Sequence, residues 1–195
     1  HSQFSDFGGI LTTDNILYFA SARDESKKKY GWNDQPFLNV YAGTYVADEE
    51  KFKDIKPVDQ LNTKHHDGPV TISADGEIMF FASESFRGGK FEKDKKNRLK
   101  KSKISVYRAK RDKDKWKDIE PVPFNSTEYM VSNPAITPDG KVLYFASDMP
   151  GTIGDMDIWK VDLLEDGTYG TPENLGTIVN TEGRESFPSI SDDGK

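Results

Sequence analysis

Three serines stand at the same place in three similar stretches of sequence, and a serine presented in this way could act as a nucleophile. The stretches read ILYFASARD at 16–24, IMFFASESF at 78–86 and VLYFASDMP at 142–150, and their serines are spaced 62 and 64 residues apart. A nucleophilic serine needs a base, an oxyanion hole and usually a sharp G-x-S-x-G turn, which is absent here. Equivalent serines at the ends of equivalent strands are typical of repeated packing. We therefore predict a structural role for Ser21, Ser83 and Ser147, and no enzymatic activity.

Metal chemistry is also poorly supported. The chain contains no cysteine, which removes thiolate catalysis and cysteine metal sites. His65 and His66 are adjacent, and neighbouring residues of an extended chain point to opposite sides, so the two rarely bind one ion. The stretches DMDIW and DKDKW begin like calcium loops but lack the glycine and the closing glutamate of that motif. We predict no metal and no cofactor.

The serines belong to a longer internal repeat. Three further markers recur with them. They are a β-branched residue followed by an aromatic one (40–41, 106–107, 158–159), an aromatic residue shortly before a proline (52–58, 116–122, 169–175), and a polar turn, usually Asp-Gly (71–77, 135–141, 189–195). Asp-Gly indicates a hairpin, and proline suits an edge strand because it cannot donate to a ladder. The markers divide each unit into four short strands, which is the pattern of a propeller blade.

The predicted fold is all-β, an incomplete β-propeller of four-stranded antiparallel blades. Aromatic residues make up 12% of the chain, which also holds 16 glycines and 10 prolines, and this mixture favours short strands joined by turns. We expect one partial propeller over 1–195, with about three blades and the first strand of a fourth. The expected boundaries are 4–64, 65–128, 129–182 and 183–195.

Length variation among the repeats is concentrated in one connection. The distance from the repeated serine to the third-strand aromatic residue is 20, 24 and 12 residues in the three units. Insertions in repeat proteins gather on one face, which is often the binding face. We therefore predict partner-binding residues in the two longer connections, although Trp32 could instead cover the edge of its blade. These residues are Tyr30, Trp32, Phe86, Arg87, Lys95, Lys96, Lys100 and Lys101.

The net charge of −6 is unevenly distributed. Residues 90–103 hold eight Lys or Arg against two acids. This loop could meet an acidic protein surface, lipopolysaccharide phosphates or an anionic glycan, whereas a solvated loop without a binding role is the alternative. Nucleic acid is not expected, because the remainder is strongly acidic and no recognition motif occurs. No apolar window is long enough to span a membrane.

A last group of charged candidates precedes the predicted fourth blade. Glu182, Arg184 and Glu185 lie in NTEGRES at 180–186, and alignment of the repeats makes Asp67, Val131 and Glu185 equivalent. Acids at two of three equivalent positions could bind a cation or a ligand amine. In the structural alternative, these charged residues form ion pairs that order the loop between blades. The valine at the equivalent position of the third repeat favours this alternative, because it interrupts the series of acids.

The repeats resemble the WD40-like PD40 propeller repeats related to the TolB propeller. The resemblance is carried by SNPAITPDGKVLYFASDMPG, DMDIWKVDL and YGTPENLGTIVNTEGRESFPSISDDGK. In the first repeat Asp14-Asn15 replaces the Asp-Gly turn. Such repeats are typical of gram-negative periplasmic proteins, above all of OmpA-family envelope lipoproteins, some of which are linked to type IX secretion. The resemblance implies a non-catalytic scaffold, periplasmic and outer-membrane associated, with protein partners in the cell envelope.

Two other functions fit a propeller. The chain could be the gating or substrate-binding propeller of a hydrolase or of a carbohydrate-processing enzyme. The hydrolase would need a G-x-S-x-G domain further along the polypeptide, and the glycan enzyme would need clustered acids at the channel mouth. A spacer between domains is the second alternative, and it predicts that removing the two insertions changes nothing.

Overall fold

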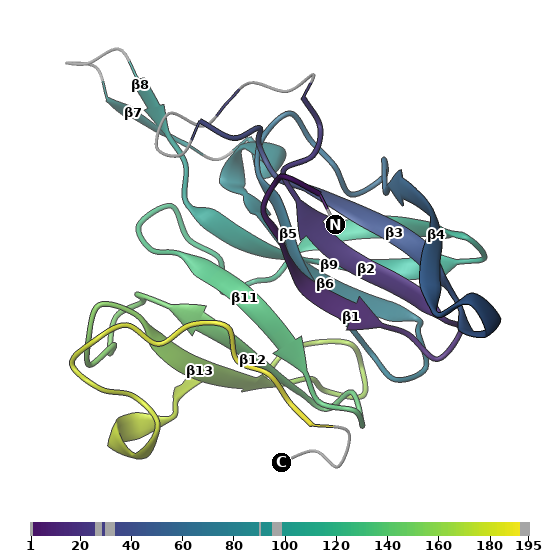
Figure 1. Ribbon diagram of the computed structural model, residues 1–195. Coiled ribbons are helices and arrows are strands. Elements are labelled where there is room, and N and C mark those ends of the chain that lie inside the picture. The colour runs from purple at the N-terminus through teal and green to yellow at the C-terminus, as the bar shows by residue number, and fades with distance from the viewer. Residues whose placement is uncertain (1, 26–28, 30–33, 90, 95–98, 192–195) are drawn as a thin grey trace.

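The computed structural model describes residues 2–25, 29, 34–89, 91–94 and 99–191. Within these ranges the chain forms three four-stranded antiparallel sheets (Figure 1). In each sheet the strands follow one another in sequence order from one edge to the other, and only the second sheet has an additional hairpin inserted between two of its strands. The first sheet contains β1 (Asp6–Leu11), β2 (Ile16–Ser21), β3 (Asn39–Val46) and β4 (Lys51–Pro57). The second contains β5 (Asp67–Ile72), β6 (Ile78–Glu84), β9 (Ile104–Asp112) and β10 (Lys115–Pro121). The third contains β11 (Val131–Ile136), β12 (Val142–Ser147), β13 (Asp157–Asp162) and β14 (Glu173–Asn174). The predicted blades are confirmed.

The polar turns close the first hairpin of each sheet in the same way. In the second and third sheets a hydroxyl donates to the aspartate two residues later, from Ser73 to Asp75 at 2.5 Å and from Thr137 to Asp139 at 2.6 Å. The glycines that follow have φ of 75° and 71°, a region that glycine adopts without a steric penalty. Asn15 holds the same position in the first sheet with φ of 61°, which asparagine tolerates better than most residues.

Each first strand contains a bulge that the sequence analysis did not anticipate. Its pairing with the second strand shifts between Phe7 and Ile10 in β1, and equivalent shifts occur in β5 and β11. At the bulge Gly8 has φ of 64°, and a Cβ atom there would lie 2.7 Å from the Cβ of Pro69. A side chain at this position would therefore push the first strands of neighbouring blades apart.

The core lies between the sheets rather than within one of them. Tyr18 and Val40 of the first sheet pack with Phe81 and Trp116 of the second in one buried cluster. A second cluster joins Phe80 and its neighbours to the third sheet. A third cluster, built around Ala146, Met156 and Ile158, lies on the opposite face of the third sheet. Each sheet thus buries apolar side chains against its neighbour, and these shared clusters hold the sheets together as in a propeller.

Three features differ from the expected pattern. β14 is only two residues long. Pro172 just before it has no amide hydrogen to donate to β13, and the Gly170 amide donates to the carbonyl of Asp162 at the end of β13. Residues 183–191 run along the third sheet without forming a strand, and their one bridge joins Arg184 to Met156, just before β13 (Figure 1). The insertion after β6 contains a 3₁₀ turn, η2 (Ser85–Gly88), and a hairpin of β7 (Glu92–Asp94) and β8 (Leu99–Lys101). Two other 3₁₀ turns are η1 (Ala47–Glu49) and η3 (Gly176–Ile178).

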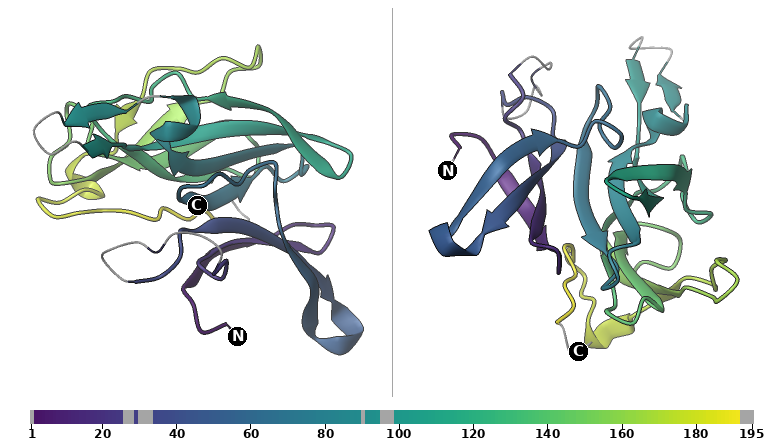
Figure 2. Two further views of the ribbon diagram at one scale, coloured as in Figure 1. Left: turned by 90° about the horizontal axis from the view of Figure 1, so that it is seen from above. Right: turned by 90° about the vertical axis from the view of Figure 1, so that its right-hand side faces the viewer.

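The two longer connections project from the same end of the molecule. Figure 2 shows that the β7–β8 hairpin and the described part of the β2–β3 connection lie at the same end of the sheets. We call the described residues of these connections, 22–25, 29, 34–38 and 85–103 without their gaps, the insertion surface. No helix among the described residues is long and apolar enough to cross a membrane.

Candidate partner-binding surface

The repeated serines are closed off from solvent at the ends of the second strands. Ser83 Oγ donates to Asp67 Oδ1 at 2.5 Å, and Ser147 Oγ donates to the carbonyl of Met130 at 2.6 Å. Ser21 Oγ accepts a hydrogen bond from Arg23 Nε at 2.8 Å. All three serines are at most 1% exposed. Their hydroxyls are used in packing contacts, and this geometry supports the structural role predicted for them.

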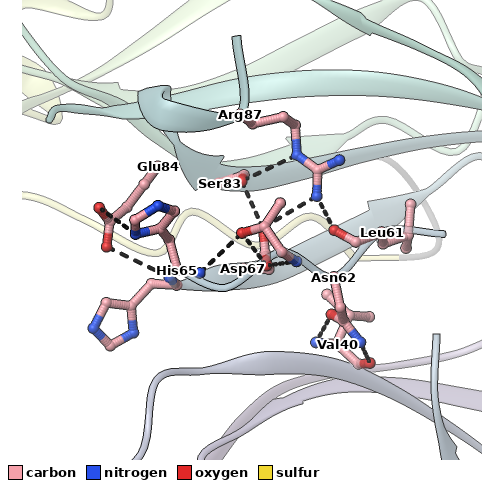
Figure 3. A network of polar contacts seen from close by, with 10 residues as sticks. Val40, Leu61, Asn62, His65, Asp67, Ser83, Glu84 and Arg87 are labelled. Atoms are coloured by element: carbon pink, nitrogen blue, oxygen red, sulfur yellow. Dashed lines mark hydrogen bonds and ion pairs between the residues drawn. The ribbon is translucent and has the colours of Figure 1, made fainter. Parts of the chain in front are cut away.

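An arginine covers the end of the second sheet (Figure 3). Arg87 donates from Nε to Ser83 Oγ and from Nη2 to Asp67 Oδ1, each at 3.2 Å, and Nη2 also donates to the carbonyl of Leu61. Its guanidinium lies 5.1 Å from the centre of the Phe81 ring and 5.6 Å from that of Tyr107, within the range of cation–π attraction. Most of the donor capacity of Arg87 is therefore used inside the blade.

The first sheet repeats this arrangement with Arg23. Its Nε contacts the serine of β2, its Nη2 donates to Asp6 Oδ1 at 2.9 Å, and its guanidinium lies 4.8 Å from the Phe19 ring and 5.1 Å from the Tyr41 ring. Burial raises the pKa of Asp6, but hydrogen bonds from Ser2, Ser21 and Arg23 outweigh it and leave this pKa below its ordinary value. Two of the three blades therefore carry the same Asp–Ser–Arg network above two aromatic rings.

The third sheet replaces the charged pair with an apolar one. Val131 occupies the position of Asp67, and Met149, two residues after the β12 serine, takes the place of the arginine. Both side chains are buried, at 0% and 7% exposure, in the cluster between the second and third sheets. The aspartate and the arginine are thus lost together, which avoids leaving one charge buried without its partner.

A second repeated contact involves asparagine side chains that sequence reasoning missed. Asn62 accepts from the Val40 amide at 2.7 Å and donates to the Val40 carbonyl at 2.9 Å. Asn125 makes the same pair of bonds with Val106, at 3.0 and 2.7 Å, and Asn180 makes them with Ile158, at 2.8 and 3.0 Å. Each asparagine satisfies both backbone groups of the β-branched residue in the third-strand marker. The signal in the sequence was an asparagine 19 or 22 residues after that residue.

Aromatic rings from both insertions meet over the junction between the first two blades. Phe37 lies 4.5 Å from His66, and Phe86 lies 4.5 Å from His65, ring centre to ring centre. The two groups are continuous, because Phe37 and His65 are also stacked at 6.4 Å. The Leu38 amide donates to His66 Nδ1 at 3.1 Å, and His65 Nδ1 lies 3.9 Å from the carboxylate of Glu84. This aromatic stack fixes the two insertions relative to each other.

A cleft of about 590 Å³ lies along the first strands of the blades. Its walls come from residues 8–13, 69–74, 76, 133–136, 138 and 187–190. The described residues that line it include no Asp, Glu, Lys, Arg or His. The clustered acids that a glycan-processing propeller would need are therefore not present on this part of the cleft. Among the described residues, no group of three or more His, Asp or Glu side chains could hold a metal ion.

The structure brings some of the predicted site residues together. Phe86 and Arg87 both belong to the η2 turn, where the former joins the aromatic stack and the latter the Asp67 network. Glu182 and Arg184 are exposed beside Glu185, whose carboxylate accepts bonds from Thr181. Lys100 and Lys101 belong to β8, described there by its backbone. Tyr30, Trp32, Lys95 and Lys96 lie outside the described residues.

The three sheets, their shared cores and the repeated networks define an incomplete β-propeller. The crystal structure of TolB from Acinetobacter baumannii is similar to the whole of this chain, with a TM-score of 0.56 and 17% sequence identity. The chain spans 37% of the length of that protein, and the likeness establishes a TolB-like propeller fold. No protein-family model matches the sequence, and no curated protein does.

Proposed function

We propose that this chain is a non-catalytic scaffold that binds a protein partner through its insertion surface. The aromatic stack carries this proposal, because residues of both insertions meet there and are held in one arrangement. A spacer between domains would have no need for this connection of the two insertions through His65. Aromatic side chains on a rigid support are frequent anchors of protein interfaces.

The envelope location is part of the same proposal. It is supported by the likeness of the repeats to PD40 repeats and of the fold to TolB. We propose a periplasmic, outer-membrane associated protein of the OmpA-family type, with a link to type IX secretion as the narrower form of the hypothesis. The blade boundaries 4–64, 65–128, 129–182 and 183–195 belong to this proposal as well, with the last segment as the start of a fourth blade.

Site-specific photo-crosslinking in the source organism tests the binding face. Benzoylphenylalanine would replace Phe86 on the insertion surface and, as the matched control, Phe52 of β4. Phe52 is 40% exposed and pairs with Tyr45 at the far end of the first sheet. We expect a discrete adduct from position 86 and none from position 52.

Two outcomes would contradict the scaffold. One is the absence of any adduct at position 86, and the other is the same adducts at both positions, which a spacer lying among neighbours would give. Fractionation of the same cells tests the location independently. Recovery of the protein in the cytoplasm would contradict the envelope assignment and leave the binding face open to a different partner.

A further inference from the structure

A separate cavity, of about 310 Å³, lies between the second and third blades. It is formed at the end of the sheets where the polar turns lie, which is opposite to the insertion surface. Its inner wall is apolar, with Ile78 and Phe80 from the second blade and Ile136 from the third. Small-molecule sites are mostly apolar cavities in which a few polar groups orient the ligand. The polar groups of this cavity therefore indicate what it could hold.

One of these polar groups is an arginine without an ion-pair partner. Arg108 of β9 donates from Nη1 to the carbonyl of Gly167 at 3.3 Å, and its buried Nε has no hydrogen-bond partner within the described part of the chain. The Tyr169 hydroxyl lies beside the same guanidinium, which opposes the rise in the tyrosine pKa that burial causes. Glu120 is opposite Arg108 in β10, yet the two side chains form no ion pair. A half-buried cation with only neutral partners is unfavourable, and an incoming carboxylate would relieve this.

The mouth of the cavity carries an aspartate with an unused oxygen. Asp75 Oδ1 accepts from the Ser73 hydroxyl at 2.5 Å and from the Glu77 amide at 2.9 Å, whereas no described residue donates to its Oδ2. These bonds lower the pKa of Asp75, so its carboxylate is charged at neutral pH. Asp75 can therefore accept a hydrogen bond from a cation at the mouth.

The junction between the first two blades shows what such an oxygen binds. Asp14 holds the position of Asp75 in the first blade, and its Oδ1 accepts from the Thr12 hydroxyl while its Oδ2 accepts from Arg111 Nη2 of the second blade at 2.7 Å. Leu163 stands at the position of Arg111 in the third blade, because the amides of both residues make the same bond within their own blades. At the second junction, the place of this guanidinium is left to a cation from outside.

We infer that this cavity binds a small aminocarboxylate, a zwitterion whose carboxylate contacts Arg108 and whose ammonium group contacts Asp75. Arg108 is half-buried and Asp75 is exposed, so the carboxylate would enter first and the methylene chain would lie on the apolar wall. The charged residues of the cavity are of both signs, which suits such a ligand better than an anion or a cation alone: Asp75, Asp139, Glu165, Arg108 and Lys141. This site is independent of the partner-binding function proposed above, which uses the opposite end of the sheets.

Three linear probes of equal length test this site on the 195-residue protein. 6-Aminohexanoate carries both charges, hexanoate only the carboxylate and hexylamine only the ammonium group. Amide NMR titration reports where each probe binds, through Gly140 and Gly167 of the cavity wall. We expect 6-aminohexanoate to shift these signals with a Kd in the millimolar range, and the other two probes to bind about tenfold more weakly or worse.

Two variants, each with a control, assign the two ends of the ligand. Arg108→Met should make 6-aminohexanoate bind as weakly as hexylamine, whereas Arg184→Met, an exposed arginine at the other end of the third sheet, should change nothing. Asp75→Asn should make 6-aminohexanoate bind as weakly as hexanoate. Asp114→Asn, in the exposed turn between β9 and β10, is its control.

Several results would overturn the assignment. They are equal binding of the three probes, no shift of Gly140 and Gly167 up to the solubility limit of 6-aminohexanoate, and unchanged binding of that probe by Arg108→Met. Circular dichroism verifies that the sheets of each variant are intact. If Arg108→Met does not fold, Arg108→Lys replaces it, since lysine keeps the charge but not the planar fork. Arg108→Lys should weaken the binding of 6-aminohexanoate and leave that of hexylamine unchanged, and equal binding of 6-aminohexanoate by this variant and the unaltered protein would exclude a contact of the carboxylate with Arg108.

Discussion

The carboxylate of Asp67 and the guanidinium of Arg87 lie 3.2 Å apart at the end of the second sheet, and neither group is replaced alone in the blade that lacks them. The carboxylate is fully buried and the arginine side chain is 14% exposed. Val131 and Met149 fill the same two positions in the third sheet. The ion pair and the apolar pair are thus alternative solutions to one packing problem within a single chain.

This relationship predicts a strongly non-additive response to mutation. Arg87→Met should destabilise the protein by roughly 3–5 kcal/mol, because Asp67 would stay buried without its counter-charge. Adding Asp67→Val should restore part of this loss, since the double variant reproduces the pair of the third blade. Urea unfolding of the two single variants, the double variant and the unaltered protein gives the coupling free energy directly.

Arg111→Met is the matched control for this cycle. Arg111 donates to Asp14 at 2.7 Å, but the aspartate side chain is 43% exposed. We expect a loss of about 1 kcal/mol or less there, as for most surface ion pairs. Single-variant effects that simply add in the Asp67–Arg87 cycle would show that the two residues do not act as a unit.

The asparagine clamps predict a second, independent set of stability effects. Asn125→Ala removes the side-chain acceptor of the Val106 amide and one of the two donors to the Val106 carbonyl, which keeps the bond from the Val122 amide. Val106 is buried between the second and third sheets. Unsatisfied buried polar groups cost about 1–3 kcal/mol each. We expect thermal or urea unfolding to show a loss of stability in this range. The neighbouring Ser126→Ala should lower the free energy of unfolding by about 0.5 kcal/mol or less, because the Ser126 hydroxyl accepts one bond in an exposed turn. Equal effects from the two variants would contradict the clamp.

The repeated markers made the blades predictable from the sequence, whereas the side-chain pairing within each blade could not be predicted from it. Strand positions followed from periodic markers, because each marker reflects a local requirement such as a hairpin turn or an edge proline. The arginine that pairs with Asp67 lies four positions after the β6 serine, whereas the arginine that pairs with Asp6 lies two positions after the β2 serine. That variable offset hides the arginine from a search at fixed spacing.

The insertions show the same limit. Their position after the second strand could be derived from spacing, and so could their common face. The contacts of Phe37 and Phe86 with His65 could not, because they join two insertions through the linker between blades. The role of Arg87 was likewise open, since the sequence shows a basic residue next to Phe86 but not the buried carboxylate that it contacts.

The basic segment of the second insertion gives a prediction about partner binding. Neutralising Lys95, Lys96, Lys100 and Lys101 should weaken binding to an acidic partner by about tenfold or more at low salt, and by less at high salt, because added ions screen the attraction. Affinity measured at two salt concentrations checks this. Four exposed lysines elsewhere serve as the control, which should change affinity little: Lys56, Lys110, Lys113 and Lys115. Unchanged affinity at low salt after the first set of substitutions would exclude the basic segment as a binding element.

The polar turns make stability depend on acid pH in a defined direction. The pKa of Asp75 is lowered, chiefly by the hydrogen bond from Ser73 and then by the Glu77 amide, and the pKa of Asp139 is lowered by Thr137 and the Lys141 amide. A carboxyl group whose pKa is lower in the folded state binds its proton more readily when the chain unfolds. Its contribution to stability is therefore fully present above its ordinary pKa of 3.8 and is lost as the pH falls through the folded value.

Ser73→Ala isolates one of these turns. Without the hydroxyl, the pKa of Asp75 should rise toward 3.8, while the pKa of Asp139 in the next blade should not move. A carboxylate NMR titration measures both groups in the same sample, so Asp139 serves as the internal control. The variant should also lose less stability than the unaltered protein between neutral pH and pH 3, because the folded and unfolded pKa values of Asp75 become more alike. An unchanged pKa of Asp75 would mean that the Glu77 amide, rather than Ser73, holds the carboxylate in its charged form.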